Sequence, residues 1–347
     1  MRDTFQRGRD IPVPGTIGDK KVPAPLLCIY SKVPRGILLI LALACVSFTS
    51  SATATPDVTT LEPDLITPPV GKGDPALGKR VFQTLAGYED SAVRHALYLP
   101  NDWEPGQRYP VIAEYTGNNG TVAGGKAAQG YGISGGTGFI WVTLPFVSED
   151  GQQDMDWWWG DPDRTADYAL ATIKMICRDW GGKKDAVILT GHSRGAIACN
   201  YIGLRNDKIA KLWAGMVPVS HYDNRGWKQT LAEQERRAER LLRLGKTPQY
   251  ICGEMQLAEK HNGKRLLELV RSRKGQSLET LSKELNLISI LEREKIREFV
   301  TTQHPVGNIT MDTFPWVNHD GDWILRDTPA RTKLRKWVAD LLDGKSK

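Results

Sequence analysis

A serine flanked by glycines stands where an apolar run passes into a helical one. The segment Gly191-His192-Ser193-Arg194-Gly195 has the form G-x-S-x-G, follows the apolar run 186–190 directly and leads into the run 196–199. On so tight a turn the residues two before and two after the serine must be small, because larger side chains would collide with neighbouring chain. This strand, turn and helix context predicts that Ser193 is a nucleophile, a group that attacks carbonyl carbon.

The surrounding sequence alternates between strand and helix signals. Short apolar or β-branched runs bounded by Gly, Pro or Asp predict strands at 92–99, 109–116, 138–147, 186–191, 212–220, 249–254 and 308–314. Helical patterns occur at 163–180, 196–204 and 328–342. The alternation predicts a three-layer α/β fold, with a mainly parallel twisted sheet and helices on both of its faces.

Two charged stretches are longer than simple crossover connections require. Residues 226–245 and 257–303 are helical in pattern and predict insertions into the fold. Their Glu and Arg residues are interspersed, which favours a solvated helical surface over a nucleic-acid site. As insertions near strand ends they could also form a lid over the site.

These features resemble the α/β-hydrolase superfamily over roughly residues 80–345. The resemblance is carried by Gly191–Gly195, by the Thr116-Gly117-Asn118 loop and by His319 before the last helix. Within the superfamily, the chain is similar to exported bacterial esterases of the polyhydroxybutyrate-depolymerase, feruloyl-esterase and acetyl-xylan-esterase kind. The resemblance implies the chain order serine, acid, histidine, which makes His319 the expected catalytic base. His221, which follows a strand end, is the second candidate histidine, as a binding residue.

The carboxylate that should orient His319 has two candidates. The order implied by the resemblance places the acid after the strand 249–253, where Glu254 is the first carboxylate. Asp223 follows the preceding strand, and some hydrolases take the acid from there. Glu254 ranks narrowly above Asp223.

Acyl transfer also needs hydrogen-bond donors for the oxyanion that forms at the carbonyl. The backbone N–H of Arg194 is one expected donor, because this residue follows the nucleophile. The second is expected from the loop after the strand 109–115, with Asn118 as our choice, although Asn118-Asn119-Gly120 is also an ordinary turn signal.

Three consecutive tryptophans follow the strand 138–147. Trp158 and Trp159, in the run 157–159, are candidate substrate-binding residues, because indole rings stack on sugars and aromatic acyl groups. The alternative is that these rings pack their loop against the domain.

The first 54 residues have the pattern of an export signal. The twelve-residue apolar run 37–48 is preceded by basic residues and followed by Ala52-Thr53-Ala54, which predicts cleavage after Ala54 and a periplasmic or extracellular protein. Residues 55–79, rich in Pro, Thr and Asp, are expected to form an exposed linker before a catalytic domain at 80–347.

The formal charge of +6 falls to +2 without residues 1–54, which hold seven Lys or Arg and three Asp. A near-neutral domain gives no electrostatic reason to expect a nucleic-acid partner, and no membrane span is expected after cleavage.

The composition and the cysteines narrow the remaining possibilities. With 40% hydrophobic and 25% charged residues the chain is that of an ordinary globular protein. Cys177, Cys199 and Cys252 match neither a zinc pattern nor a disulfide framework, and no dinucleotide motif is present, so no cofactor is expected. We therefore expect an exported serine hydrolase that cleaves small-molecule or polymer-linked carboxylic esters. Carbohydrate-linked esters and polyesters are the substrate classes considered. A serine peptidase of the same fold and a non-catalytic binding protein on a hydrolase scaffold are the alternatives.

Overall fold

The computed structural model describes residues 57–124, 127–222, 239–254, 309–314, 316 and 318–344. The expected leader at 1–54 lies outside the described residues, as does the insertion at 257–303. Of the insertion at 226–245, residues 239–245 are described, and 239–242 are helical.

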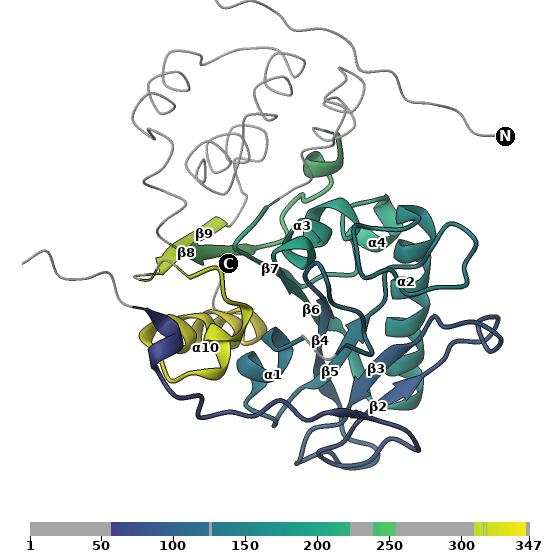
Figure 1. Ribbon diagram of the computed structural model, residues 1–347, viewed down its shortest axis with the longest axis horizontal. Coiled ribbons are helices and arrows are strands. Elements are labelled where there is room, and N and C mark those ends of the chain that lie inside the picture. The colour runs from purple at the N-terminus through teal and green to yellow at the C-terminus, as the bar shows by residue number, and fades with distance from the viewer. Residues whose placement is uncertain are drawn as a thin grey trace, which may run out of the picture. The chain divides into compact units, whose positions relative to one another are not determined.

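The described strands form one nine-stranded sheet in the order β1-β2-β3-β5-β4-β6-β7-β8-β9 (Figure 1). The strands are β1 (Val70–Gly71), β2 (Arg80–Gln83), β3 (His95–Tyr98), β4 (Tyr109–Tyr115), β5 (Ile140–Leu144), β6 (Gly182–His192), β7 (Gly215–Val219), β8 (Gln249–Glu254) and β9 (Ile309–Phe314). β3 is antiparallel to both of its neighbours, whereas the other pairs are parallel. The predicted, mainly parallel sheet is confirmed.

The register of the central strands brings their carboxyl ends together. Tyr115, the last residue of β4, pairs with Gly191 near the end of β6. The loop that follows β4 and the turn that follows β6 therefore leave the sheet at the same edge. In open α/β sheets ligands bind at this edge.

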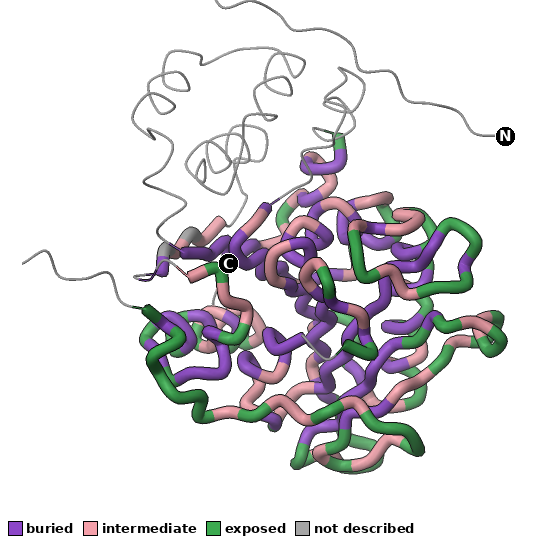
Figure 2. The backbone as a smooth tube through the Cα atoms, viewed as in Figure 1, coloured by how far each residue is buried: buried purple, intermediate pink, exposed green. Residues whose placement is uncertain are grey.

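Helices cover both faces of the sheet (Figure 1). One apolar cluster joins alternate residues of β4 and β5 to α2 (Pro162–Asp179), α3 (Arg194–Tyr201) and α4 (Asp207–Ala210). A second cluster joins the opposite side chains of the same strands to the 3₁₀ helix η3 (Gly321–Leu325) and α10 (Pro329–Leu342), and α1 (Gln129–Ser134) lies on that face. Figure 2 shows the sheet buried between these layers. The three-layer α/β fold is the predicted one.

Some short elements were absent from the prediction. β2 has only four residues, and polar Arg80 and Gln83 stand at its ends, so it lacks an apolar run. α1 contains Gly130 and Gly132, which are poor helix formers. The carboxylate of Glu114 in β4 accepts the backbone N–H groups of residues 128, 129 and 130, so a tertiary contact stabilises the start of this helix.

The segment expected to be an exposed linker is mostly exposed, but it also makes defined contacts with the domain. It contains the 3₁₀ helix η1 (Val58–Thr60) and strand β1, and its backbone donates to Leu325 O from Asp64 and Leu65. Arg331 of α10 also binds both carboxylate oxygens of Asp64, at 2.7 and 2.6 Å. We call residues 57–67 the strap. The contacts of the strap are made by single polar groups, so its lack of apolar periodicity gave no indication of them.

No helix in the described part of the chain is long and apolar enough to cross a membrane.

Cys177, Cys199 and Cys252 are free thiols, and burial raises the pKa of Cys177 and of Cys199 above the ordinary value. Two of the three, Cys199 and Cys252, are fully buried as expected for small core residues.

Candidate active site

Ser193 occupies a strained turn between β6 and α3. Its φ of +58° and ψ of −117° lie in a region that side chains with a Cβ rarely adopt. The turn is held by the hydrogen bond from Ser193 N to Val219 O, at 3.0 Å. A Cβ at Gly195 would lie 2.0 Å from Tyr115 O, and one at Gly191 would lie 2.4 Å from the carbonyl carbon of Gly195. Glycine is therefore required on both sides of Ser193 because any side chain there would collide with main-chain atoms.

His319 and Glu254 meet beside this turn. Nδ1 of His319 lies 2.5 Å from Oε1 of Glu254, and Ser220 Oγ donates to the other carboxylate oxygen, also at 2.5 Å. Glu254 ends β8 with its side chain 3% exposed, whereas the His319 side chain is 44% exposed. The structure thus brings together the expected base and the higher-ranked acid. Asp223 lies outside the described residues.

The hydrogen bonds determine the charge of Glu254. Burial by itself raises the pKa of this carboxyl, but the contacts with His319 and Ser220 outweigh it and hold the pKa below the ordinary value of 4.5. Glu254 is therefore ionised at neutral pH and accepts a hydrogen bond from the N–H at Nδ1 of His319. That tautomer leaves Nε2 as the ring nitrogen that can take a proton.

The two expected oxyanion donors lie at the start of α3 and on the loop after β4, which passes close to Ser193. A Cβ at Gly117 would lie 3.7 Å from Ser193 Cβ, so the loop after β4 runs directly past Ser193. Arg194 is the first residue of α3, where backbone N–H groups have no partner within the helix. Among the described residues, neither the Arg194 N–H nor the Asn118 N–H donates to a protein acceptor.

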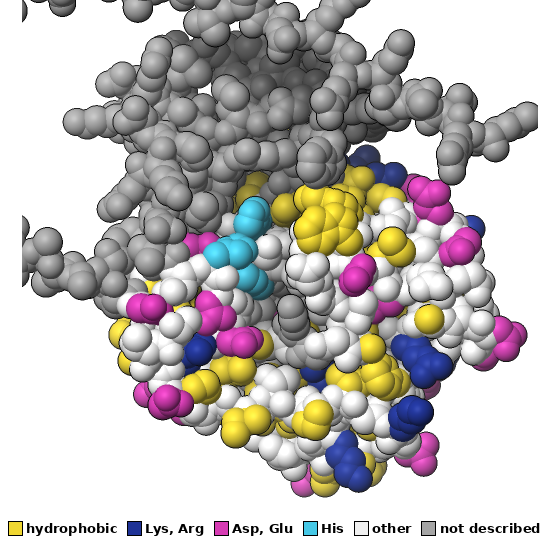
Figure 3. Space-filling view, viewed as in Figure 1, with side chains coloured by type: hydrophobic (Ala, Val, Ile, Leu, Met, Phe, Trp, Pro, Cys, Tyr) yellow, Lys and Arg dark blue, Asp and Glu magenta, His cyan; other side chains and the backbone are white. Residues whose placement is uncertain are grey.

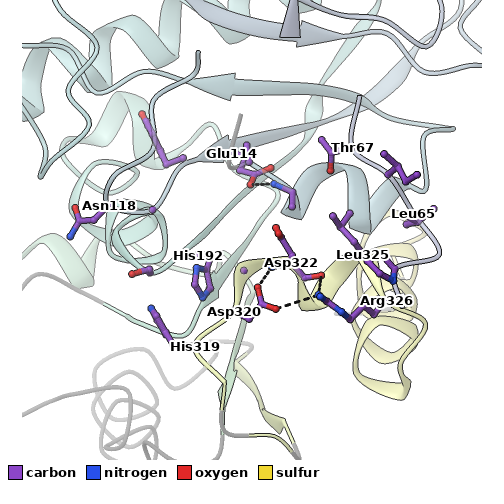
Figure 4. Close-up of a pocket in the computed structure, with 18 residues that line it drawn as sticks. Leu65, Thr67, Glu114, Asn118, His192, His319, Asp320, Asp322, Leu325 and Arg326 are labelled. Carbon is purple, nitrogen blue, oxygen red and sulfur yellow. Dashed lines mark hydrogen bonds and ion pairs between the residues drawn. The ribbon is translucent and has the colours of Figure 1, made fainter. Parts of the chain in front are cut away.

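A pocket of about 840 Å³ opens at this position. Ser193, His319, Asn118 and Gly117 line it together with His192. Its other walls come from the strap (Pro63, Leu65, Ile66, Thr67), from β4 and the residues just before α1 (Glu114, Tyr115, Ala127, Ala128) and from the segment after His319 (Asp320, Gly321, Asp322, Leu325, Arg326). Figure 4 shows the two histidines across the pocket from Leu65, Leu325 and Arg326.

Three histidines gather at the edge of this pocket. The ring centres of His192 and His221 lie 4.5 and 5.2 Å from that of His319, and Figure 3 shows the histidine side chains beside a hollow in the surface. Burial and the neighbouring His319 lower the pKa of His192 to about 3, so His192 is neutral. His192 lines the same pocket as Ser193. His221 contacts His319 but is not a lining residue of the pocket.

The tryptophans predicted to bind substrate lie elsewhere. Trp159 is 9% exposed and packs against Phe146 and Tyr201, and Trp158 is half-buried against the same core. Neither lines the pocket that contains Ser193. Trp159 therefore packs its loop against the domain, which was the alternative interpretation of these rings.

Several residues of the pocket, and Ser220 beside Glu254, were missed by sequence reasoning. The strap residues and Ser220 gave no signal, because neither an apolar period nor a motif marks them. Glu114 stands inside an apolar strand, and a buried carboxylate there could have drawn attention as an unusual residue. Among the described residues no group of three or more His, Cys, Asp or Glu side chains could hold a metal ion.

The strand order and the turn together define the class of fold. Leaving out the short edge strand β1, the second strand of the sheet is antiparallel, and the strained serine follows the central strand β6 and precedes α3. This is the α/β-hydrolase fold.

Comparison with known proteins adds neighbours in structure but none in sequence. No protein-family model matches the chain, and no curated protein matches it. Among solved structures, a thermostable esterase has a TM-score of 0.41 and 14% identity, over 75% of this chain and 62% of that one. A dipeptidyl peptidase 4 from Porphyromonas gingivalis has a TM-score of 0.48 and 13% identity, over 76% and 35%. A mutant feruloyl esterase module from Clostridium thermocellum, complexed with sinapinate, has a TM-score of 0.45 and 13% identity, over 81% and 94%.

The chain thus spans less than two thirds of the first two of these proteins. All three TM-scores lie below 0.5, so the class of fold is assigned from the strand order and the serine turn of this chain.

Proposed function

We propose that this protein is a serine hydrolase that cleaves carboxylic esters through a Ser193–His319–Glu254 triad. The observation that carries the proposal is the 2.5 Å contact between His319 Nδ1 and Glu254 Oε1, in a pocket that His319 shares with the strained Ser193. An ionised, buried carboxylate beside a partly exposed imidazole is the arrangement in which the imidazole acts as a general base.

The proposed reaction proceeds in two stages. Ser193 Oγ attacks the ester carbonyl while His319 Nε2 takes the hydroxyl proton, and the N–H groups of Arg194 and Asn118 stabilise the resulting oxyanion. His319 then returns the proton to the departing alcohol, which leaves an acyl group on Ser193. Water, activated by the same imidazole, attacks the acyl-enzyme and releases the acid.

Labelling with a fluorophosphonate probe tests whether Ser193 is an activated nucleophile. We expect the wild type to be labelled and Ser193→Ala to be unlabelled. Ser91→Ala removes a hydroxyl from a turn that is remote in sequence and bonded to Tyr88 O, and it should label like the wild type. An unlabelled wild type, or equal labelling of Ser193→Ala, would reject the triad and favour a non-catalytic binding protein.

A substrate panel separates esterase from peptidase. Hydrolysis of p-nitrophenyl acetate that disappears in Ser193→Ala supports the ester specificity, whereas cleavage of peptide anilides alone would make the protein a serine peptidase. Carbohydrate-linked esters and polyesters form a second arm of the panel. Both remain predictions from the sequence: the polyesters rest on the family resemblance alone, and the tryptophans that suggested carbohydrate-linked esters do not line the pocket.

We also propose that the protein is exported and cleaved after Ala54. In support, cleavage there retains the whole strap, including the bond from Val58 N to Asn318 Oδ1 beside His319. When the full chain is expressed in a bacterial host, the exported product should begin at Thr55. A cytosolic product that keeps residue 1 would contradict the proposal.

A further inference from the structure

The side chain of Arg194, the residue after the nucleophile, is buried under the turn. It is 1% exposed, and its guanidinium carbon lies 4.0 Å from the ring centre of Phe146. Sequence reasoning assigned a role only to the backbone of this residue. A fully buried arginine is uncommon unless its donors are satisfied, so its partners indicate what it does.

All five N–H donors of this guanidinium have acceptors, and the acceptors belong to two loops. Nε and one Nη2 donor reach Thr116 O and Thr116 Oγ1, at 3.4 and 3.2 Å, and the second Nη2 donor reaches Gly120 O at 2.7 Å. Nη1 reaches Met155 O at 3.0 Å and Trp158 O at 2.7 Å. Thr116 and Gly120 are the two ends of the loop that carries Asn118.

The two loops are also bonded to one another. Asn119 N donates to Asp156 O at 2.8 Å, and Trp158 N donates to Asn118 Oδ1 at 3.4 Å. Thr116 Oγ1 donates to Gly120 O at 2.7 Å, which closes the loop after β4 on itself. The guanidinium therefore lies at the centre of a hydrogen-bonded network that surrounds Asn118.

The charge of Arg194 persists in this site. Burial lowers its pKa to about 10, and Asp154 and Asp156 oppose that effect, so the group is cationic at neutral pH. Five fixed donors on a planar group can hold carbonyls in several directions at once. A lysine ammonium has three donors at a single point and cannot reproduce this pattern.

We propose that Arg194 is a positioning residue for the oxyanion hole. Its backbone N–H is one expected donor, and its side chain holds both ends of the loop that presents the other, so one residue determines the separation of the two donors. The proposal rests on the hydrolase function proposed above. Its consequence is that the loop at 155–158, including Trp158, supports the oxyanion hole from behind instead of binding substrate.

Steady-state kinetics of Arg194→Lys and Arg194→Met test this role. Because misplacing a reacting group by about 1 Å can cost up to about 100-fold in rate, we expect kcat of Arg194→Lys to fall by about 10- to 100-fold with little change in KM. A trifluoromethyl ketone, which forms an oxyanion on Ser193, should lose affinity in parallel with kcat/KM. The pH dependence of kcat/KM should keep its midpoint, because His319 and Glu254 are untouched.

Arg80→Lys is the matched control. Arg80 is 2% exposed, lies 4.1 Å from the ring centre of Trp141 and has a pKa lowered by burial to about 10, but it contacts neither loop. It should lose stability to urea as Arg194→Lys does while keeping kcat and inhibitor affinity.

The outcomes separate the two proposals. Wild-type kcat and inhibitor affinity in a folded Arg194→Lys protein would overturn the positioning role, and so would equal losses in Arg80→Lys. A wild type without hydrolysis or probe labelling would instead overturn the proposed function. If Arg194→Met is insoluble, Arg194→Lys decides the question alone.

Discussion

Glu254 and His319 are in direct contact although 65 positions separate them in the chain. Glu254 is the last residue of β8, and it pairs in register with Phe314 at the end of β9. The segment after β9 therefore begins beside Glu254, and five residues later it carries His319 back onto the carboxylate. Parallel pairing of β8 with the edge strand β9 is what brings Glu254 and His319 together.

Glu254→Gln should lower kcat while leaving the protein folded. The amide keeps the shape of the side chain but cannot stabilise a positively charged imidazole, and it favours the wrong tautomer of His319. Loss of the orienting carboxylate in such a triad costs about 10²- to 10⁴-fold in kcat. Hydrolysis of p-nitrophenyl acetate measures the loss. Ser220→Ala, which removes one donor to Glu254 but leaves the charge, should lose about 10-fold or less. Wild-type kcat in Glu254→Gln would show that His319 is oriented by another group.

Gly195→Ala should destabilise the protein more than a typical glycine substitution. Its Cβ would lie 2.0 Å from Tyr115 O, and the main chain of β4 cannot move without disturbing the sheet. We expect the free energy of unfolding to fall by about 3 kcal/mol or more. Gly71→Ala meets only ordinary contact, 3.8 Å from Arg80 O, and should change it by about 0.5 kcal/mol or less. Urea denaturation measures both, and similar midpoints for the two variants would contradict the predicted clash.

His95 should make the protein less stable in mild acid. Its side chain is fully buried, and burial lowers its pKa from the ordinary 6.5 to about 3. Between those values the unfolded chain binds a proton that the folded protein does not, so the free energy of unfolding falls as the pH drops below 6.5. The slope from one such group approaches about 1.4 kcal/mol per pH unit.

His95→Gln removes this titration and should flatten the dependence of unfolding free energy on pH between 6.5 and 4. His192, also neutral with a pKa of about 3, acts in the same direction and persists in the variant. Urea unfolding at a series of pH values checks the difference. Parallel curves for wild type and variant would mean that His95 takes up its proton without unfolding.

Asp64→Asn should weaken substrate binding more than catalysis. Asp64 anchors the strap through two bonds to Arg331, whose side chain is 5% exposed, and its neighbours Leu65, Ile66 and Thr67 line the pocket. Because the pair is partly solvated at Asp64, we expect KM to rise by about 2- to 10-fold with kcat nearly unchanged. Asp327→Asn, which removes the more exposed partner of Arg331, is the control. An unchanged KM for esters of increasing size would remove the strap from substrate binding.

Much of the fold could be predicted because its signals are local. The apolar run before Gly191 and the demand for small residues around Ser193 act within a few positions, so the turn and its flanking elements follow from short-range sterics. The strands at 109–116, 249–254 and 308–314 were recognised for the same reason, and β8 was predicted with its observed bounds.

Contacts between distant residues could not be predicted in this way. Asp64 meets Arg331 across 267 positions, and Arg194 reaches Gly120 across 74, through single polar groups that leave no periodic pattern. The strap was predicted to be a linker, and the tryptophans were left between substrate binding and packing of their loop. Exposure and packing are decided by neighbours from other parts of the chain.

The sequence by itself thus determined Ser193 as the candidate nucleophile, its turn, the α/β class and His319 as the candidate base, because each depends on residue type and on local order along the chain. Only the tertiary structure placed Glu254 against His319, folded the strap over the pocket and turned the Arg194 side chain onto the loop that carries Asn118. These relationships depend on which strands pair and which carbonyls face a buried charge, and packing of the whole sheet decides both.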